Sequence, residues 1–320
     1  MMGTVVVTGG AGFIGSNLVN HLVRNDYDVI IIDNLSSGRE EFIKDALNSG
    51  KAKLIKLDLK KVPPNELSRI LSGAKTVYHL AANPEVRVSV TNPKIHFDEN
   101  VVATFNVIEA CRLGDVGELV FTSSSTVYGD AKVFPTPENH ELRPISVYGA
   151  SKAACESLIC SYAYLYGFKA ASLRYANIVG PRLRHGVIYD FLMKLKKNPN
   201  VLEVLGDGTQ KKSYLYISDT IEATLLVTDK LTEKFETYNI GNEDWITVAE
   251  IAEIVSKAAG FKPKIVFTGG TPDGRGWPGD VKYMLLSIEK IKRLGWKPKH
   301  TSREAIELTA KALAKEVFFR

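Results

Sequence analysis

Short apolar runs and amphipathic stretches alternate along the first half of the chain. Thr4–Thr8 and Asp28–Asp33 are rich in β-branched residues and are typical of buried strands, while Phe13, Leu18 and Leu22 between them follow helical spacing. The strand-like runs that come next are 53–58, 76–80, 118–123 and 169–174. The helical patterns between them are 64–72, 95–113 and the stretch that begins near residue 148. Strands separated by helices of this length predict a parallel sheet with helices on both faces.

A glycine-rich turn joins the first predicted strand to the first predicted helix. Gly9, Gly12 and Gly15 lie in this turn, where glycines permit a tight bend and a close approach to phosphates, and a helix N-terminus directs free amides toward it. The next strand ends in Asp33, about 20 residues further on, where a carboxylate can bind both hydroxyls of an adenosine ribose. These features predict dinucleotide binding. Because a carboxylate repels a ribose 2′-phosphate, we expect NAD rather than NADP.

Ligands of open parallel sheets bind beyond the carboxyl ends of the strands. The residues at these positions are Asp58, Leu59, Ala81, Ala82 and Ser123 to Ser125. The small side chains at 81 and 82 let a ring or a pyrophosphate approach closely, although ordinary turn residues explain them equally well. Asn100 is unfavourable inside the long predicted helix. It either reaches the backbone beneath the site or lies on the surface.

Tyr148 and Lys152 are four residues apart at the start of a predicted helix, so both side chains lie on one face. A free phenol titrates near ~10, and a fixed positive neighbour lowers that pKa toward neutrality. The pair therefore suits a tyrosine base. The same spacing is common in plain amphipathic helices, so the assignment depends on the cofactor features described above.

Composition narrows the class of protein. The 320 residues are 45% hydrophobic and 24% charged, as in ordinary globular proteins, and the net charge of +5 is spread without a basic block. This argues against nucleic acid as a partner. Cys111, Cys155 and Cys160 lack metal-like spacing with histidine, so we expect no metal site and a reducing compartment. With no charged leader and no apolar run of ~18 residues, we expect a cytoplasmic protein without membrane contact.

Several sequence blocks resemble those of one known family. In the first half they are 8–15 (TGGAGFIG), 33–38 (DNLSSG), 79–82 (HLAA), 123–129 (SSSTVYG) and 148–152 (YGASK). In the second half they are 173–177, 180–182, 206–210, 238–241 and 275–280. In order and spacing these blocks resemble the extended short-chain dehydrogenase/reductase family, in particular its nucleotide-sugar epimerases. The resemblance covers almost the entire chain.

The resemblance implies a fold class and a division of the chain. We expect an α/β fold, a Rossmann-type doubly wound parallel sheet with a smaller, discontinuous C-terminal substrate lobe. Residues 1–175 would form the NAD-binding domain, to which segments near 218–241 return, and 176–320 would mainly form the nucleotide-sugar lobe. The final amphipathic stretches, 287–294 and 302–317, are predicted helices with a structural role or a role in a subunit contact. A homodimer with a helical interface is implied by the family.

The resemblance also implies which residues bind NAD. These are Gly9, Gly12, Phe13, Ile14, Gly15, Asp33, Asn34, Ser36, Ser37, Gly38, Asp58, Leu59, Leu80, Ala81, Ala82, Asn100, Ser123, Tyr148, Lys152 and Tyr175.

Three residues are implied to be catalytic: Tyr148, Lys152 and Ser124. In the family, a serine or threonine at the position of Ser124 hydrogen-bonds the sugar hydroxyl that is oxidised. Relatives that dehydrate a nucleotide hexose carry an Asp-Glu pair at the next two positions, where this chain has Ser125 and Thr126. Because dehydration needs a general acid to release water, the missing acids argue for simple epimerisation.

The substrate residues implied by the family are less regular here. They are Asn83, Ser124, Tyr148, Asn177, Arg182, Val187, Lys212, Arg275 and Asp280. Lys212 stands where relatives have arginine and loses the planar two-pronged donor. Trp277 stands where relatives have another arginine. We therefore expect Arg275 or Arg184 to bind the diphosphate in their place.

The expected activity is interconversion of UDP-glucose and UDP-galactose, through transient oxidation at sugar carbon 4 by bound NAD. A different nucleotide sugar is the alternative, such as a UDP-uronic acid, a UDP-N-acetylhexosamine or a dTDP-sugar, and the pocket near Asn83, Arg87, Val187 and Tyr283 would decide. Arg87 invites a carboxylate, although a surface role fits it as well. A non-catalytic NAD sensor on the same fold is a third reading.

Overall fold

A seven-stranded parallel sheet forms the centre of the molecule, with strand order β11–β6–β5–β4–β1–β2–β3. The structure is a computed structural model that describes residues 3–318. The strands of this sheet are β1 (Thr4–Thr8), β2 (Asp28–Asp33), β3 (Ala52–Lys56), β4 (Thr76–His79), β5 (Glu118–Ser124), β6 (Lys169–Tyr175) and β11 (Phe235–Ile240). The order from β3 to β6 is that of a dinucleotide-binding fold, so the predicted α/β class is confirmed.

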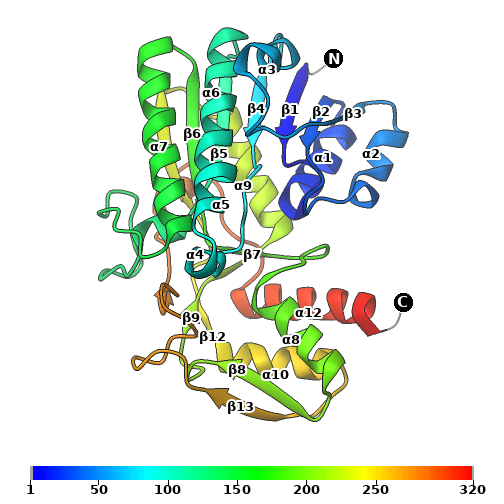
Figure 1. The fold of residues 1–320 in the computed structure, drawn as a ribbon, viewed down its shortest axis with the longest axis vertical. Helices are drawn as coiled ribbons and strands as arrows, with labels where there is room; N and C mark the ends of the chain where they lie inside the picture. Colours follow the sequence, from blue (N-terminus) through cyan, green and yellow to red (C-terminus); the bar gives the residue numbers. More distant parts are fainter. Residues whose placement is uncertain (1–2, 319–320) are drawn as a thin grey trace.

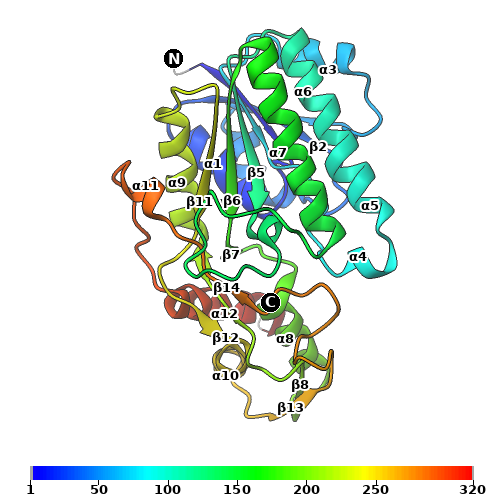
Figure 2. The ribbon, with the colours of Figure 1, turned by 90° about the vertical axis from the view of Figure 1, so that its left-hand side faces the viewer.

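Helices cover both faces of the sheet, as Figures 1 and 2 show. Val5 and Val7 of β1 point into one hydrophobic core and Val6 into the other, as the alternation of side chains along a strand requires. The first core includes α1 (Phe13–Arg24), α2 (Lys44–Asn48) and α9 (Ile217–Asp229). The second includes α3 (Pro64–Leu71), α6 (Ala103–Leu113) and α7 (Val147–Tyr166).

A smaller lobe lies beyond the carboxyl ends of the strands and has its own core (Figure 1). It is built on α8 (Gly186–Lys197), α10 (Val248–Ala258) and α12 (Ser302–Phe318), with β8 (Val201–Leu205) and β13 (Lys264–Thr268) paired in parallel. Its remaining strands are β7 (Asn177–Val179), β9 (Lys211–Lys212), β10 (Tyr214–Tyr216), β12 (Ile246–Thr247) and β14 (Tyr283–Met284). Between these segments the chain returns to the sheet domain as α9 and β11.

The helical pattern at 95–113 is interrupted. It consists of α5 (Lys94–His96), a π-helical turn (Phe97–Val102) and α6. The sheet domain also contains the short helix α4 (Val88–Thr91) and two 3₁₀ turns, Glu40–Phe42 and Ser125–Tyr128. Asn100 lies inside this π turn, a type of turn that often occurs at functional sites.

The prediction of a helix at 287–294 was largely wrong, since only α11 (Glu289–Lys292) is helical. The preceding residues are extended instead. Leu286 forms a bridge with Thr136, and the Ser287 amide donates to the Thr136 carbonyl at 2.8 Å. A long-range pairing, which the local pattern does not contain, therefore delays the start of the helix.

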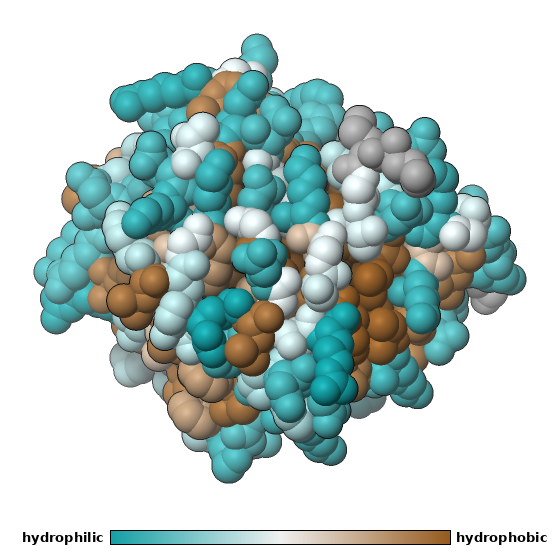
Figure 3. All heavy atoms as spheres, turned by 90° about the horizontal axis from the view of Figure 1, so that it is seen from above, coloured by the Kyte–Doolittle hydropathy of each residue, from teal (hydrophilic) through white to brown (hydrophobic). Residues whose placement is uncertain are grey.

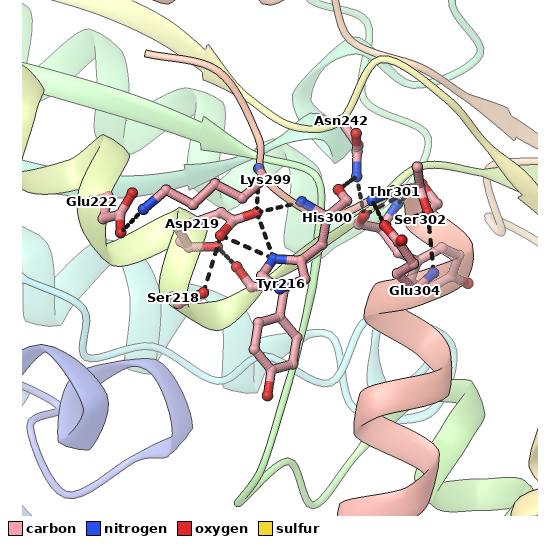
Figure 4. Close-up of polar contacts among 12 residues, drawn as sticks. Tyr216, Ser218, Asp219, Glu222, Asn242, Lys299, His300, Thr301, Ser302 and Glu304 are labelled. Atoms are coloured by element: carbon pink, nitrogen blue, oxygen red, sulfur yellow. Dashed lines mark hydrogen bonds and ion pairs between the residues drawn. The ribbon is translucent and has the colours of Figure 1, made fainter.

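The buried carboxylate of Asp219 joins the two lobes (Figure 4). Asp219 lies in the first turn of α9 and is fully buried. Its Oδ2 accepts from the amides of Lys299 and His300 at 2.9 and 3.1 Å, just before α12 begins. The His300 ring lies 5.0 Å from the Tyr216 ring. These contacts fix α12 of the small lobe to α9 of the sheet domain.

The end of the molecule remote from the small lobe is mostly hydrophilic, with separate apolar groups, in the view of Figure 3. Within residues 3–318, none of the helices has the length and apolar character needed to cross a bilayer.

Candidate active site

A cavity of about 820 Å³ lies where the carboxyl ends of the strands meet the small lobe. Its wall contains all the predicted catalytic residues and most of the predicted binding residues. The predicted residues that line it are Gly9, Gly12, Phe13, Ile14, Gly15, Asp33, Asn34, Ser36, Ser37, Asp58, Leu59, Leu80, Ala81, Ala82, Asn83, Ser123, Ser124, Tyr148, Lys152, Tyr175, Asn177, Arg182, Val187, Lys212 and Asp280. Gly38, Asn100 and Arg275 are outside this wall.

The glycine turn permits close packing at one end of the cavity. A Cβ on Gly15 would lie 2.1 Å from the Gly9 carbonyl oxygen, and one on Gly9 would lie 2.7 Å from the Ala81 amide nitrogen. Gly9 also has φ +66°, a conformation that favours glycine. The amides in the first turn of α1 cannot be paired within the helix, and Gly12 provides no side-chain cap. This helix end can therefore bind an anion.

The Asp33 carboxylate is held at the end of β2 by two backbone amides. Oδ2 accepts from Ala11 at 2.9 Å and Oδ1 from Leu35 at 2.8 Å, while the residue remains part of the cavity wall. A Cβ on Gly38 would lie 2.8 Å from Asp33 Oδ1, so this glycine lets the following loop pack against the carboxylate. A fixed carboxylate suits ribose hydroxyls and disfavours a phosphate at the same place.

A buried histidine supports the turn after β4. His79 is fully buried, with Nδ1 2.7 Å from the Thr8 hydroxyl and Nε2 2.9 Å from the Thr104 hydroxyl. Burial lowers the pKa of His79 to about 3, so the ring is neutral. Thr8 Oγ1 in turn accepts from the amides of Leu80 and Ala81 at 3.2 and 3.3 Å. His79 is part of the 79–82 sequence block. Its burial and these contacts show that it supports the turn after β4.

Asn100 supports the site from below. Its Oδ1 accepts from the Asn83 amide at 2.8 Å, and its Nδ2 donates to Ser151 Oγ at 2.9 Å. The expectation that Asn100 reaches the backbone beneath the site is confirmed, and the surface alternative is wrong because the residue is 1% exposed. The π turn rotates this side chain toward α7 and the loop after β4.

The first turns of α7 place Tyr148 and Lys152 against the ends of β5. Ser146 caps the helix by accepting from the Gly149 amide, and the Tyr148 amide donates to Ser89 Oγ at 3.1 Å. Lys152 is 2% exposed, and its Nζ donates to the Thr122 carbonyl at 2.8 Å. Its Nζ lies 6.0 Å from the centroid of the Tyr148 ring.

Burial controls the protonation of this pair. It raises the pKa of Tyr148 to about 12, and a hydrogen bond with Ser124 acts in the opposite direction. It lowers the pKa of Lys152 to about 8, while Cys155 and Glu156 counteract this effect. The protein alone therefore holds a neutral phenol beside a lysine that loses its charge just above neutral pH. Positive charge brought into the cavity would favour the phenolate.

The residues after Ser124 contain no acid that could release water. Ser124 Oγ accepts from the Thr126 amide at 3.2 Å and from the Thr126 hydroxyl at 2.9 Å. Ser125 is 9% exposed and also lines the cavity. The local geometry therefore provides hydroxyl groups and no carboxylate at these positions.

A buried ion pair lies on the same helix face one turn after Lys152. Arg174 of β6 donates to both carboxylate oxygens of Glu156, with Nη2 at 2.6 Å from Oε2. Arg174 Nη1 donates to the Tyr128 hydroxyl at 2.8 Å, which donates to Asn239 Oδ1 at 2.7 Å. No local pattern in the sequence indicates this network, because its members come from α7, β6, β11 and the turn after β5.

The predicted substrate residues lie in different parts of the site. Lys212 pairs with Asp280 at 2.6 Å, and Asn177 Nδ2 donates to the Ser213 carbonyl at 3.1 Å, all in the part of the wall that the small lobe forms. Arg182 donates to Ser16 Oγ of α1 at 3.1 Å, which places it at the glycine-turn end.

Arg275 is engaged away from the cavity. Its Nη1 donates to Asp130 and its Nε to Asp273, at 2.7 and 2.6 Å. Arg184 pairs with Glu316 at 2.7 Å. Arg275 and Arg184, the two arginines expected to bind the diphosphate, are therefore both already paired with carboxylates.

Fold and site together define the class. The strand order, the glycine turn at the N-terminus of α1 and the fixed Asp33 carboxylate all suit NAD. The hydroxyl of Ser123, in the same cavity wall, is buried without a hydrogen-bond partner among residues 3–318 and is available to a ligand. Tyr148 and Lys152 lie in the same cavity wall, as an NAD-dependent enzyme with a tyrosine base requires.

The chain belongs to the NAD dependent epimerase/dehydratase family, whose model matches residues 5–241. It is 37% identical to a putative UDP-glucose 4-epimerase of Methanocaldococcus jannaschii over 308 residues, which cover 95% of this chain and 96% of the relative. A crystal structure of UDP-galactose 4-epimerase is 50% identical with a TM-score of 0.88, covering 98% and 100% of the two chains. The UDP-glucose 4-epimerase of Thermotoga maritima, solved with UDP-glucose, is 32% identical with a TM-score of 0.87, covering 98% and 99%.

Proposed function

We propose that this protein is a UDP-glucose/UDP-galactose 4-epimerase. The observation that carries the proposal is the grouping of Ser124, Tyr148 and Lys152 on one cavity wall, with no carboxylate at residues 125 and 126. Relatives that cover nearly the whole chain carry this activity in their names, which supports the choice of substrate.

In this proposal Tyr148 moves the proton. As phenolate it takes the proton from the 4-hydroxyl of the sugar and later returns it. Ser124 aligns that hydroxyl, and charged Lys152 lowers the Tyr148 pKa and holds the nicotinamide ribose. Bound NAD supplies the acceptor and donor of hydride at sugar carbon 4. The keto sugar turns within the cavity between the two transfers, so the configuration at carbon 4 is inverted without net redox change.

The two ends of the cavity would bind different molecules, NAD at one end and the nucleotide sugar at the other. The glycine-turn end, with Gly9, Gly12, Asp33 and the first turn of α1, would hold the phosphates and adenosine ribose of NAD. Asn177, Lys212 and Asp280, next to the small lobe, would hold the nucleotide of the sugar substrate. Arg182 lies on the NAD side because it contacts Ser16 of α1.

We place the domain division at residue 175, after β6. Residues 1–175 with 218–241 would form the NAD-binding domain, because β11 pairs with β6 and α9 packs in the first core. The remaining part of 176–320 would form the substrate lobe around α8, α10 and α12.

We also propose that the protein is a cytoplasmic homodimer. Large apolar side chains are exposed on the outer sides of the neighbouring helices α6 and α7, which contact each other. Phe105 is 43% exposed, and Tyr164, Leu165 and Tyr166 are 61, 72 and 50% exposed. A second copy could bury these side chains in a helical interface. Sedimentation analysis of the wild type and of Leu165→Glu tests this, since the charge should dissociate such a dimer.

A substrate panel tests the proposed function. Purified protein with NAD is offered UDP-galactose, UDP-N-acetylglucosamine, UDP-glucuronate and dTDP-glucose, and the products are separated by chromatography. Conversion of UDP-galactose to UDP-glucose at the highest kcat/KM supports the proposal. Preference for another sugar would favour a neighbouring epimerase. Binding of NAD without conversion of any sugar would favour the non-catalytic sensor.

A further inference from the structure

One arginine in the cavity wall lacks an anionic partner at the substrate end. Among the cationic side chains that line the cavity within residues 3–318, Lys60, Arg184 and Lys212 pair with carboxylates. Lys152 donates to a backbone carbonyl. Arg182 contacts Ser16 at the NAD end. Arg87 is the remaining cation, and its guanidinium contacts an aromatic ring.

That ring belongs to Trp277, which comes from the opposite lobe. The Arg87 guanidinium carbon lies 5.5 Å from the centroid of the Trp277 ring. Lys212 Nζ lies 5.8 Å from the same ring, and all three residues line the cavity. The face of an aromatic ring attracts and orients a guanidinium. The N–H groups of the guanidinium lie in its own plane and stay free to donate hydrogen bonds. One indole thus holds two cations near one part of the cavity.

The segment that carries Trp277 is fixed to the sheet domain. Arg275 is bound by Asp130 and Asp273, and its Nη1 also donates to the Asp280 carbonyl at 2.7 Å. Arg275 therefore acts as a structural anchor for the loop and is not available for the substrate. This explains how an indole at position 277 can be placed reliably across the cavity from Arg87.

Arg87 is connected to both Tyr148 and Lys212 by its neighbours in the fold, and it shares the Trp277 ring with Lys212. It directly precedes α4, whose Ser89 accepts a hydrogen bond from the Tyr148 amide. Tyr148 is the residue that would meet carbon 4 of the sugar. A cation that is linked to Tyr148 through α4 and to Lys212 through Trp277 suits the phosphate attached to the sugar, which is the β-phosphate of a UDP-sugar.

We propose that Arg87, oriented by Trp277, binds the β-phosphate of the nucleotide sugar from the sheet domain, opposite Lys212 of the small lobe. This inference rests on the proposed function. A guanidinium donates two parallel hydrogen bonds to a phosphate, so Arg87 replaces the planar donor that this chain lacks at residues 212 and 277. Because Arg87 and Lys212 belong to different lobes, the phosphate would bridge them.

The test uses calorimetric binding of UDP, UMP and UDP-glucuronate to the NAD-loaded protein. Arg87→Gln should weaken UDP about tenfold or more and leave UMP, which lacks the β-phosphate, within about threefold. Arg87→Lys should recover part of the loss, and Trp277→Leu should weaken UDP in the same direction. Arg143→Gln is the matched control, because the Arg143 side chain is 71% exposed.

Each other outcome contradicts a defined part of the proposal. Unchanged UDP binding by Arg87→Gln would overturn it, and equal losses for UDP and UMP would place the contact away from the β-phosphate. If Arg87→Gln weakened the binding of UDP-glucuronate alone, Arg87 would bind the carboxylate of the sugar and not the β-phosphate. Failure of the wild-type protein to bind UDP would refute the proposed function itself, and the inference with it. Thermal unfolding of each variant identifies losses caused by misfolding.

Discussion

Glu156 of α7 and Arg174 of β6 form a two-pronged ion pair behind the reactive end of the cavity, and both side chains are at most 7% exposed. Glu156 follows Lys152 by one helical turn, and it raises the pKa of that lysine against the effect of burial. The pair therefore links the position of α7 to the charge of Lys152. Arg174 also holds the turn after β5 through the Tyr128 hydroxyl.

Replacing Glu156 should change the pH dependence of catalysis. Glu156→Gln removes a negative charge and leaves Arg174 unpaired, and both effects lower the pKa of Lys152 below about 8. Because the reaction needs charged Lys152, the alkaline limb of kcat should move to lower pH, by ~0.5–1 unit. Cys155, Tyr148 and His79 also face Lys152 and are unchanged in this variant.

The control for this prediction is Glu253→Gln, which changes an exposed glutamate of α10. Its pH profile should match that of the wild type. A purely structural role of Glu156 would lower stability and kcat at every pH and leave the alkaline limb in place. Breaking a buried pair typically costs ~3–5 kcal/mol, so the profile is measured well below the unfolding temperature.

Asp33 should determine the choice of cofactor. Asp33→Ser keeps an acceptor for the backbone amides but removes the charge that binds ribose hydroxyls and repels a 2′-phosphate. We expect NAD affinity to fall about tenfold or more, with the ratio of NADP to NAD affinity rising. Calorimetric titration with each dinucleotide measures the two affinities. Asp229→Ser, at the exposed end of α9, should alter neither.

Asp219 should contribute strongly to stability and little to chemistry. Asp219→Ala removes the fully buried acceptor of the Lys299 and His300 amides in Figure 4 and leaves these partly buried donors unpaired. The expected loss is about 2–4 kcal/mol in the free energy of unfolding. Glu222→Ala is the matched control: the Glu222–Lys299 pair is exposed, so its loss should cost below ~1 kcal/mol. Equal losses in the two variants, measured by chemical denaturation, would contradict the structural role of Asp219.

Local pattern predicted the parts of the site that lie on regular elements. β1, the glycine turn, Asp33 at the end of β2 and the first turns of α7 follow from periodicity and motif spacing, and the structure places them around one cavity. Parallel pairing brings the carboxyl ends of the strands together, so residues after each strand could be grouped in advance.

Contacts between distant segments limited the prediction elsewhere. Thr136 keeps residues 286–287 extended, which no local pattern reveals. The sequence predicts Arg275 or Arg184 at the diphosphate, whereas the structure pairs Arg275 with acids at 130 and 273 and Arg184 with Glu316. The Glu156–Arg174 pair and the stacking of Arg87 on Trp277 likewise depend on side chains from separate elements.

The base should be identifiable by one substitution. Tyr148→Phe removes the group that takes the proton and keeps the ring, including its edge contact with His96 at 5.6 Å. We expect kcat on UDP-galactose to fall by about two to four orders of magnitude, while UDP and NAD binding change little. Retention of most of the activity would assign the base elsewhere. Ser161→Ala on the exposed side of α7 serves as the control.

The fate of the hydrogen on carbon 4 distinguishes hydride return within the site from exchange with solvent. The NAD-loaded protein is incubated with UDP-galactose in heavy water, and the products are followed by proton NMR. We expect a mixture of UDP-galactose and UDP-glucose in which carbon 4 carries no deuterium, because the hydrogen leaves and returns as a hydride that does not exchange with solvent. Deuterium at carbon 4, or no formation of UDP-glucose, would contradict it.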